Sequence, residues 1–190
     1  MKEILEKIIR YMFNKRLSKQ LKHEVRERRF VNYTSAKTVL LLFESDFMER
    51  NAEIRQLIQT FNADGKKVMA WGYVEKKEIS TAILPDFRIL HQKDADFTGL
   101  IHEPYRRELE ELTFDLLIDL TVNEVKPLQY IALYSNAACK AGTHSYPGMY
   151  DVIVDTAMLK AENTSNEVET TAIDIYNQLF FYLKNIQTND

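Results

Sequence analysis

The sequence predicts an α/β protein, a three-layer sandwich built on a mostly parallel sheet, with an amphipathic helix at its N-terminus. Residues 114–120 (FDLLIDL) contain a short apolar run, Leu116–Ile118, that is followed by an acid, Asp119. A polar turn follows, Pro127 opens a helix, and a second short strand ends at Gly142. Such a strand–helix–strand unit joins parallel strands. A second continuous apolar run, Val39–Phe43, favours the same fold because only a sheet covered on both faces buries such a run.

Six strands and five helices are expected. Each strand is a short apolar run bounded by polar residues, and each helix repeats its apolar residues every three or four positions. In chain order the elements are a helix at 2–26, a strand at 38–43, a helix at 47–62, strands at 67–74 and 87–90, a helix at 105–113, a strand at 116–120, a helix at 127–136, strands at 139–142 and 151–155, and a helix at 167–185.

Local signals support these boundaries. The helix at 47–62 has an apolar face, and Asp64–Gly65 ends it as a C-cap pair. Residues 91–104 are expected to be irregular, and residues 143–150 form a loop. The closing helix is preceded by a cap region at 163–165. Its apolar face consists of Ile173, Tyr176, Leu179, Phe180 and Leu183.

Right-handed crossovers favour a Rossmann-like strand order of 3-2-1-4-5-6, with the topological switch between the first and fourth strands. Two connections are short. The second and third strands are joined by few residues for a helix, and residues 143–150 are fewer than a normal parallel crossover needs. The sixth strand is therefore expected to be either antiparallel at an edge or joined by a tight irregular loop.

Length, charge and cysteine content limit the function classes. The 190 residues fit one α/β domain (38–190) with a helical arm (1–37). A net charge of −3 does not suggest DNA binding by the whole chain. No run of 18 apolar residues is present, so no transmembrane segment is expected. The single cysteine, Cys139, excludes an internal disulfide and is expected to be a buried thiol, and the protein is expected to be cytoplasmic.

The arm is basic and amphipathic. Residues 1–37 contain eleven Lys or Arg against four Glu, a net charge of +7, and the remaining residues carry −10. The apolar stripe consists of Leu5, Ile9, Phe13, Leu17, Leu21 and Val25, widened by Ile4, Ile8 and Met12. Because this stripe is regular, Leu17 and Leu21 are expected to be buried. Several partners for this stripe fit the sequence: its own domain, a second copy of the chain, another protein or a membrane surface. RNA has less support, because the arm contains few aromatic residues that could stack on bases.

Two resemblances rest on particular segments. Residues 114–120, the helix after them and Lys140-Ala141-Gly142 resemble a "YDLVIDL" strand, a helix and a strand ending "RIG" in the N-terminal Rossmann-like domain of heptosyltransferase-type glycosyltransferases. About thirty residues are covered. Those enzymes bind the sugar nucleotide mainly in a second domain, which this chain is too short to hold.

The second resemblance spans nearly the whole chain. A basic N-terminal helix, a "VLLL" strand, the segment Lys93-Asp94-Ala95-Asp96-Phe97-Thr98-Gly99 and an "FDLLI" strand are similar to a family of short bacterial proteins of unknown function. In that family the middle segment reads Lys-Asp-x-x-Phe-x-Gly. The resemblance implies the fold and brings no activity with it.

Catalytic, cofactor and metal motifs are missing from the sequence. Neither a GxGxxG after a strand nor a Walker A motif occurs, which argues against NAD and ATP, and no cofactor is expected. No GxSxG elbow surrounds a serine, and a pairing of Cys139 with His144 is not favoured because Cys139 lies within a strand pattern. The polar cluster at 91–103 matches no metal spacing, and its Asp94 and Asp96 are expected to cap turns. We therefore assign no catalytic residue and no metal ligand.

A ligand, if one binds, is expected at the switch point between the first and fourth strands, where the flanking loops part. Asp46, Asp119 and Asp155 end strands at that edge, and paired acids there can do acid–base work or simply cap the turns that follow. The expected binding residues are Ser45, Asp46, Asp119, Thr121, Asn123 and Lys126. Their charges favour a neutral, cationic or hydroxylated ligand. The sequence thus predicts a non-catalytic interaction module or homo-oligomer using the N-terminal helix, with a small-molecule or sugar-nucleotide-binding protein as the alternative.

Overall fold

The computed structural model describes residues 2–23, 26–45, 49–75, 87–144, 146, 148–155 and 171–185. It contains a six-stranded sheet in the order β3-β2-β1-β4-β5-β6, in which all neighbouring pairs are parallel. The predicted fold class and strand order are confirmed. The strands are β1 (Thr38–Glu44), β2 (Lys67–Val74), β3 (Arg88–His91), β4 (Thr113–Asp119), β5 (Asn136–Gly142) and β6 (Val152–Ile153).

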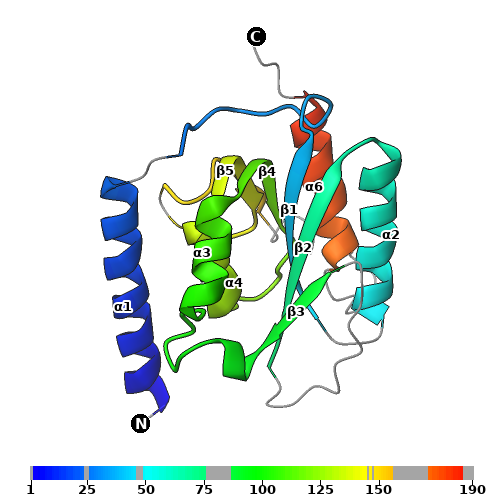
Figure 1. The fold of residues 1–190 in the computed structure, drawn as a ribbon. Helices are drawn as coiled ribbons and strands as arrows, with labels where there is room; N and C mark the ends of the chain where they lie inside the picture. Colours follow the sequence, from blue (N-terminus) through cyan, green and yellow to red (C-terminus); the bar gives the residue numbers. More distant parts are fainter. Residues whose placement is uncertain are drawn as a thin grey trace.

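Helices cover both faces of this sheet, which gives three layers (Figure 1). The helices are α1 (Lys2–Lys22), α2 (Glu49–Ala63), α3 (Glu103–Glu111), α4 (Lys126–Tyr134) and α6 (Ala172–Asn185), with a 3-10 turn, η1 (Gln92–Asp94). Side chains of β1 alternate between the layers: Leu41 packs in the core with α2 and α6, whereas Leu40 and Leu42 pack in the core with α1, α3 and α4. This two-sided burial explains the continuous apolar run.

Several expected element boundaries differ from the structure. Strands β4 and β5 each begin three residues earlier than expected, at Thr113 and Asn136, and most of the other ends that differ shift by one or two residues. Helix α1 ends at Lys22 and not at residue 26, because Arg26 is buried and its guanidinium binds Asp151 and two carbonyls of β5. Helix α4 ends at Tyr134, because Asn136 already pairs with Thr113 in the sheet. Helix α3 spans 103–111 and not 105–113, because a proline is tolerated in the first turn of a helix and Pro104 lies there. Strand β6 is parallel and has two residues, so the short connection before it is the tight irregular loop.

The cap region at 163–165 and the start of the closing helix, residues 167–170, lie outside the described residues. No helix among the described residues is long and apolar enough to cross a membrane. The division into an arm (1–37) and a domain (38–190) stays a prediction. Within that arm, Val31, Tyr33 and Ala36 are buried in the core beside α2 and α6.

Asp115 joins the middle of the sheet to the end of the arm. Its carboxylate accepts hydrogen bonds from the amides of Lys37 (2.8 Å) and Thr38 (2.9 Å) and from the Thr38 hydroxyl, and Arg29 lies 3.3 Å away. Burial by itself raises the pKa of Asp115, but these hydrogen bonds and the charge of Arg29 outweigh it and lower the pKa below its ordinary value. The ionised carboxylate therefore stabilises the start of β1.

Replacing Asp115 by asparagine is expected to lower the free energy of unfolding by about 1.5–3 kcal/mol at pH 7, since hydrogen bonds to a charged acceptor are lost. The folded pKa is depressed, so this stabilisation is present above the unfolded pKa of about 3.9 and is lost as the pH falls through the folded value. Urea unfolding from pH 7 to pH 3 should therefore show a shallower acid loss in Asp115→Asn. Glu111→Gln, at an exposed position of α3, is the control; equal acid profiles for Asp115→Asn and the wild type would contradict this role.

Candidate functional site

The carboxyl edge of the sheet holds a buried network around Asp119, the last residue of β4. Its carboxylate accepts hydrogen bonds from the Thr121 amide (3.0 Å), the Thr121 hydroxyl (2.7 Å) and the Tyr150 hydroxyl. Gly142 makes room for the last contact, because a Cβ there would lie 2.9 Å from Tyr150 Cε1 and 3.1 Å from Asp119 Cβ. Asp119 thus caps the turn after β4, as one of the two alternatives predicted, and also fastens the loop after β5.

Thr121 connects this carboxylate to His144. The Thr121 hydroxyl lies 3.0 Å from His144 Nε2. When the Thr121 hydroxyl donates its hydrogen to Asp119, the His144 tautomer that carries its proton on Nε2 is the one that donates to Thr121. Burial raises the pKa of Asp119, although the Tyr150 hydrogen bond and the His144 charge act in the opposite direction. Burial also raises the pKa of Tyr150 well above its ordinary value, so its hydroxyl remains a donor.

The network does not have the geometry of a nucleophilic site. In an acid–base–nucleophile triad the imidazole lies between the carboxylate and the hydroxyl. Here the Thr121 hydroxyl lies between Asp119 and His144, and Thr121 is 1% exposed. Neither Thr121 nor Asp119 can reach a substrate from this position, so the arrangement fastens two loops together.

Glu44 bridges the switch point between β1 and β4. Its carboxylate accepts hydrogen bonds from the amides of Val122 (2.9 Å) and Asn123 (2.7 Å) and from the Asn123 side chain (3.1 Å). The loop after β4 is therefore held against the end of β1 at the place where the flanking loops were expected to part.

Ser45 is buried beside the start of α2. Its hydroxyl donates to Asn51 Oδ1 (3.0 Å), and Asn51 Nδ2 has no hydrogen-bond partner among the described residues although Asn51 is only 3% exposed. Exchanging the two amide atoms leaves the oxygen without a partner instead. A buried polar atom without a partner is uncommon in a folded protein, so this atom marks a position that an added acceptor would satisfy.

Lys126 turns away from the switch point toward α1. Its ammonium binds Glu124, Gln129 Oε1 (3.0 Å) and the Tyr146 hydroxyl (3.1 Å), and it lies 5.0 Å from the centre of the Phe13 ring. The side chain thus joins the start of α4, the loop after β5 and the N-terminal helix in one contact.

The polar cluster at 91–103 stabilises turns. Asp94 accepts from the His91 amide (2.9 Å) and from the Tyr105 hydroxyl (2.7 Å), and Asp96 accepts from the Thr98 and Leu100 amides. Burial and the bond to Asp94 raise the pKa of Tyr105 to about 12. The predicted turn-capping roles of Asp94 and Asp96 are confirmed. No group of three potential metal ligands occurs among the described residues.

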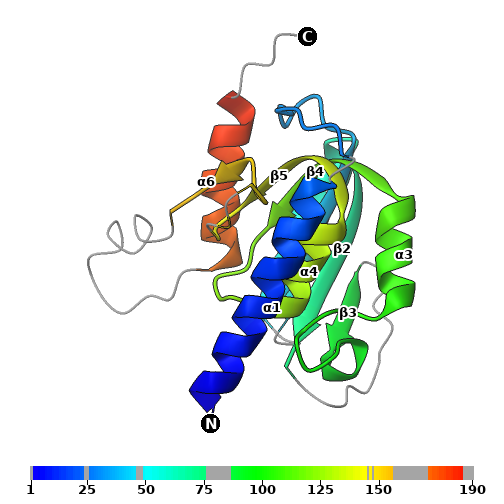
Figure 2. The same cartoon turned by 90° about the vertical axis from the view of Figure 1, so that its left-hand side faces the viewer.

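Helix α1 lies across α4, and its first turns extend past the body of the protein (Figure 2). Its second half is docked: Phe13 is fully buried with edge contacts to Tyr130 and Tyr146, Leu17 is buried, and Arg16 donates to the Thr98 and Tyr130 hydroxyls. The predicted burial of Leu17 is confirmed, and Leu21 is partly buried in the same core.

A second face of α1 points to solvent. Residues three or four positions apart share a side of a helix, and one such series carries exposed apolar side chains in the first three turns and lysines in the next three. We call it the outward face, and it consists of Ile4, Leu5, Ile8, Tyr11, Lys15, Lys19 and Lys22, with the exposed Lys7 bordering its apolar half. The exposed fractions of its apolar members, Ile4, Leu5, Ile8 and Tyr11, are 64%, 49%, 47% and 68%.

Comparison with known families places the chain. The model of a family of unknown function, DUF6913, matches residues 6–170, which include most of α1 and all six strands. The chain belongs to DUF6913. Searches of curated proteins and of solved structures give no match.

The predicted binding residues of this DUF6913 chain come together only in part. Asp119 and Thr121 are in contact, but both are buried. Asn123 is exposed and bound to Glu44, whereas Ser45 pairs with Asn51 and Lys126 faces Tyr146. Asp46 lies outside the described residues. Ligand binding by these residues stays a prediction.

Three partners at this edge were not predicted: Glu44, His144 and Tyr150. Glu44 lies at the end of a strand like the acids that were considered, and its position alone could have singled it out. Tyr150 comes close to Asp119 through a loop whose path no local pattern determines. Cys139, by contrast, is buried within β5 as expected, and burial raises the pKa of its thiol.

Proposed function

We propose that this protein is a non-catalytic interaction module in which the outward face of α1 binds a protein partner. The observation that supports the proposal is the exposure of four large apolar side chains in successive turns, in line with three lysines. Contiguous exposed apolar residues mark interaction surfaces. The partner surface that fits is apolar opposite Ile4, Ile8 and Tyr11 and acidic opposite Lys15, Lys19 and Lys22.

A symmetric pairing of two α1 helices fits this face poorly. In a parallel pair the lysines of one copy would face those of the other, and in an antiparallel pair they would face Ile4 and Ile8. A helix lying in a membrane surface carries its apolar residues along its length with cations on the polar face. In α1 the apolar residues occupy one end and the lysines continue in line, which favours a protein surface with two chemical halves.

Cross-linking from Tyr11, replaced by a photoreactive phenylalanine, identifies a candidate partner, and binding is then measured by calorimetry with both proteins purified. We expect Ile8→Glu and Lys19→Glu each to weaken binding at least tenfold. Matched controls are Arg10→Glu, exposed on another side of α1, and Lys67→Glu, exposed at the start of β2.

Three results would contradict the proposal: unchanged binding in Ile8→Glu and Lys19→Glu, self-association that Ile8→Glu abolishes, or binding only to vesicles containing phosphatidylserine. The second result would assign the face to another copy of the chain, and the third would assign it to a membrane. A cytoplasmic location is part of the proposal and rests on the single, buried cysteine.

The alternative function, a small-molecule or sugar-nucleotide-binding protein, is favoured by one observation. Within the part of the chain that the structure describes, Asn51 Nδ2 lacks a hydrogen-bond partner beside Ser45 at the carboxyl end of β1. A ligand oxygen could accept from it. Thermal-shift screening with nucleosides, nucleotides and sugar nucleotides tests this function, since a ligand at 100 times its dissociation constant adds about 2.7 kcal/mol of stability. A ligand whose stabilisation survives in Asn51→Ala would not use this site.

A further inference from the structure

A cavity of about 350 Å³ lies on the α1 side of the sheet, near the C-terminal ends of α1 and α4 and thus away from the predicted switch-point site. Its volume is within the range of small-ligand pockets, at the lower end. Apolar and polar side chains share its wall. The described lining residues are Gln20, Leu21, Arg26, Glu110, Leu133, Tyr134, Ser135, Asn136, Lys140 and Met149.

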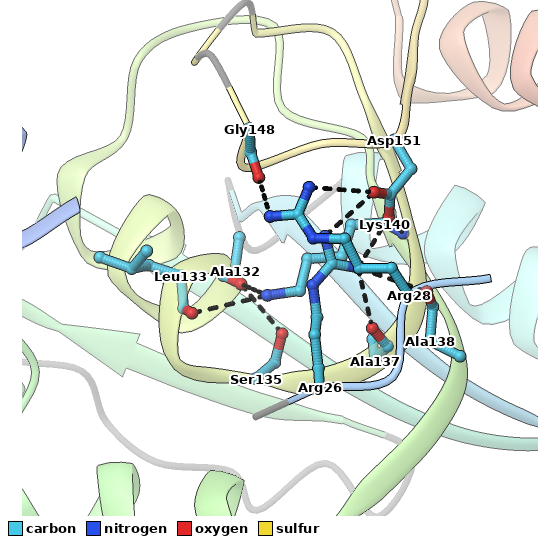
Figure 3. A network of polar contacts seen from close by, with 10 residues as sticks. All are labelled: Arg26, Arg28, Ala132, Leu133, Ser135, Ala137, Ala138, Lys140, Gly148 and Asp151. Carbon is cyan, nitrogen blue, oxygen red and sulfur yellow. Dashed lines mark hydrogen bonds and ion pairs between the residues drawn. The ribbon is translucent and has the colours of Figure 1, made fainter. Parts of the chain in front are cut away.

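Lys140 supplies a buried positive charge to this cavity. It is 2% exposed, and its ammonium donates to the carbonyls of Ala132 (2.6 Å) and Leu133 (3.5 Å) at the C-terminal end of α4 (Figure 3). Those carbonyls carry the negative end of the helix dipole. An anion in the cavity would stabilise the Lys140 ammonium further, because the attraction between two charges in a buried site is little screened by salt.

Arg26 is a second cationic side chain in the cavity wall, and its contacts hold it in one position. Its guanidinium pairs with both oxygens of Asp151 (2.7 and 3.0 Å), and Arg28 lies 3.8 Å from the same carboxylate while donating to the Gly148 carbonyl (Figure 3). Asp151 also accepts from the Lys140 amide (2.8 Å). The carboxylate thus balances Arg26 and fixes the strand that presents Lys140.

The cavity wall also carries polar groups that the protein does not use. The side chains of Gln20 and Asn136 and the hydroxyl of Tyr134 form no hydrogen bond with the described residues, and all three residues are half-buried. Glu110 is the acid of the described lining and is exposed, so solvent and salt screen its charge more than that of Lys140. The apolar part consists of Leu21, Leu133 and Met149.

We propose that this cavity binds a small organic anion, with its carboxylate or phosphate toward Lys140 and its apolar part against Leu133 and Met149. Gln20, Tyr134 and Asn136 would complete the hydrogen bonds of the anionic group. This site is independent of the outward face of α1, which lies on another side of that helix.

Titration of the ¹⁵N-labelled full chain, followed by NMR, tests the proposal with three matched probes: benzoate, phenyl phosphate and benzyl alcohol. We expect saturable shifts at the amides of residues 133–136 and 140 with benzoate or phenyl phosphate, and at least tenfold weaker binding of benzyl alcohol. The stronger of the two anions identifies the acidic group. Asn136→Asp, which adds a negative charge to the wall, should weaken anion binding at least tenfold, and Glu110→Gln should strengthen it.

Asn62→Asp is the matched control, since it makes the same change at an exposed position of α2 on the opposite side of the sheet. It should leave anion binding unchanged. The proposal is overturned if neither anion gives saturable shifts, if benzyl alcohol binds as tightly as benzoate, or if folded Asn136→Asp binds benzoate like the wild type. Amide spectra of each variant confirm that it is folded before binding is compared.

Discussion

Phe13→Ala is expected to destabilise the fold by about 3–5 kcal/mol, the usual cost of removing a buried aromatic side chain. Phe13 is fully buried between Tyr130 and Tyr146 and also contacts the Lys126 ammonium. Its loss leaves a cavity under α1 and removes one of the contacts that join α1 to α4 and to the loop after β5. Urea unfolding followed by far-ultraviolet circular dichroism measures the change.

Tyr11→Ala is the matched control for that measurement. Tyr11 lies on the same helix but is 68% exposed, and substitutions at exposed positions usually change stability by less than about 0.5 kcal/mol. If Phe13→Ala were as stable as Tyr11→Ala, α1 would not be docked on α4 in solution. The predicted packing of the arm on its own domain would then fail.

Asp151→Ala is expected to cost about 3–5 kcal/mol, because it removes the carboxylate partner of a buried guanidinium. The Arg26 and Asp151 side chains are 3% and 11% exposed, so water can replace the lost partner only poorly. The same substitution removes the acceptor of the Lys140 amide in the sheet. Thermal and urea unfolding at pH 7 measure the loss.

The double variant Arg26→Met, Asp151→Ala separates the charge from the packing. Replacing a buried ion pair by apolar groups is often close to neutral, so the double variant should recover a large part of the stability lost in Asp151→Ala. A double variant no more stable than Asp151→Ala would show that the hydrogen bond to the Lys140 amide, and not the ion pair, carries the effect.

The strand order was predictable because it depends on signals that are local or topological. Continuous apolar runs such as Val39–Phe43 require cover on both faces, and right-handed crossovers leave few orders for six parallel strands. The element ends were less predictable. The end of α1 depends on the ion pair of Arg26 with Asp151, which lie 125 positions apart in the chain, and no local pattern contains that contact.

The apolar stripe of α1 was predictable from the sequence, but which of its residues are buried and which are exposed was not. Periodicity placed Ile4, Leu5 and Ile8 in one stripe with Phe13 and Leu17. In the structure, Phe13 and Leu17 are buried against the core with α4, whereas Ile4, Leu5 and Ile8 are exposed in the first turns of the helix. Which apolar residues are covered depends on where the body ends, and only the tertiary structure fixes that position.

The sequence alone determined the layered α/β fold, the parallel order of the sheet and the presence of acids at the ends of its strands. These features follow from periodicity and chain handedness, which act over short distances along the chain. The tertiary structure decided that Asp119 is buried against Tyr150, that Glu44 bridges the switch point, and that Lys140 and Arg26 line a cavity on the α1 side. Those contacts join residues from different strands and loops, so their geometry exists only once the sheet and its helices have packed.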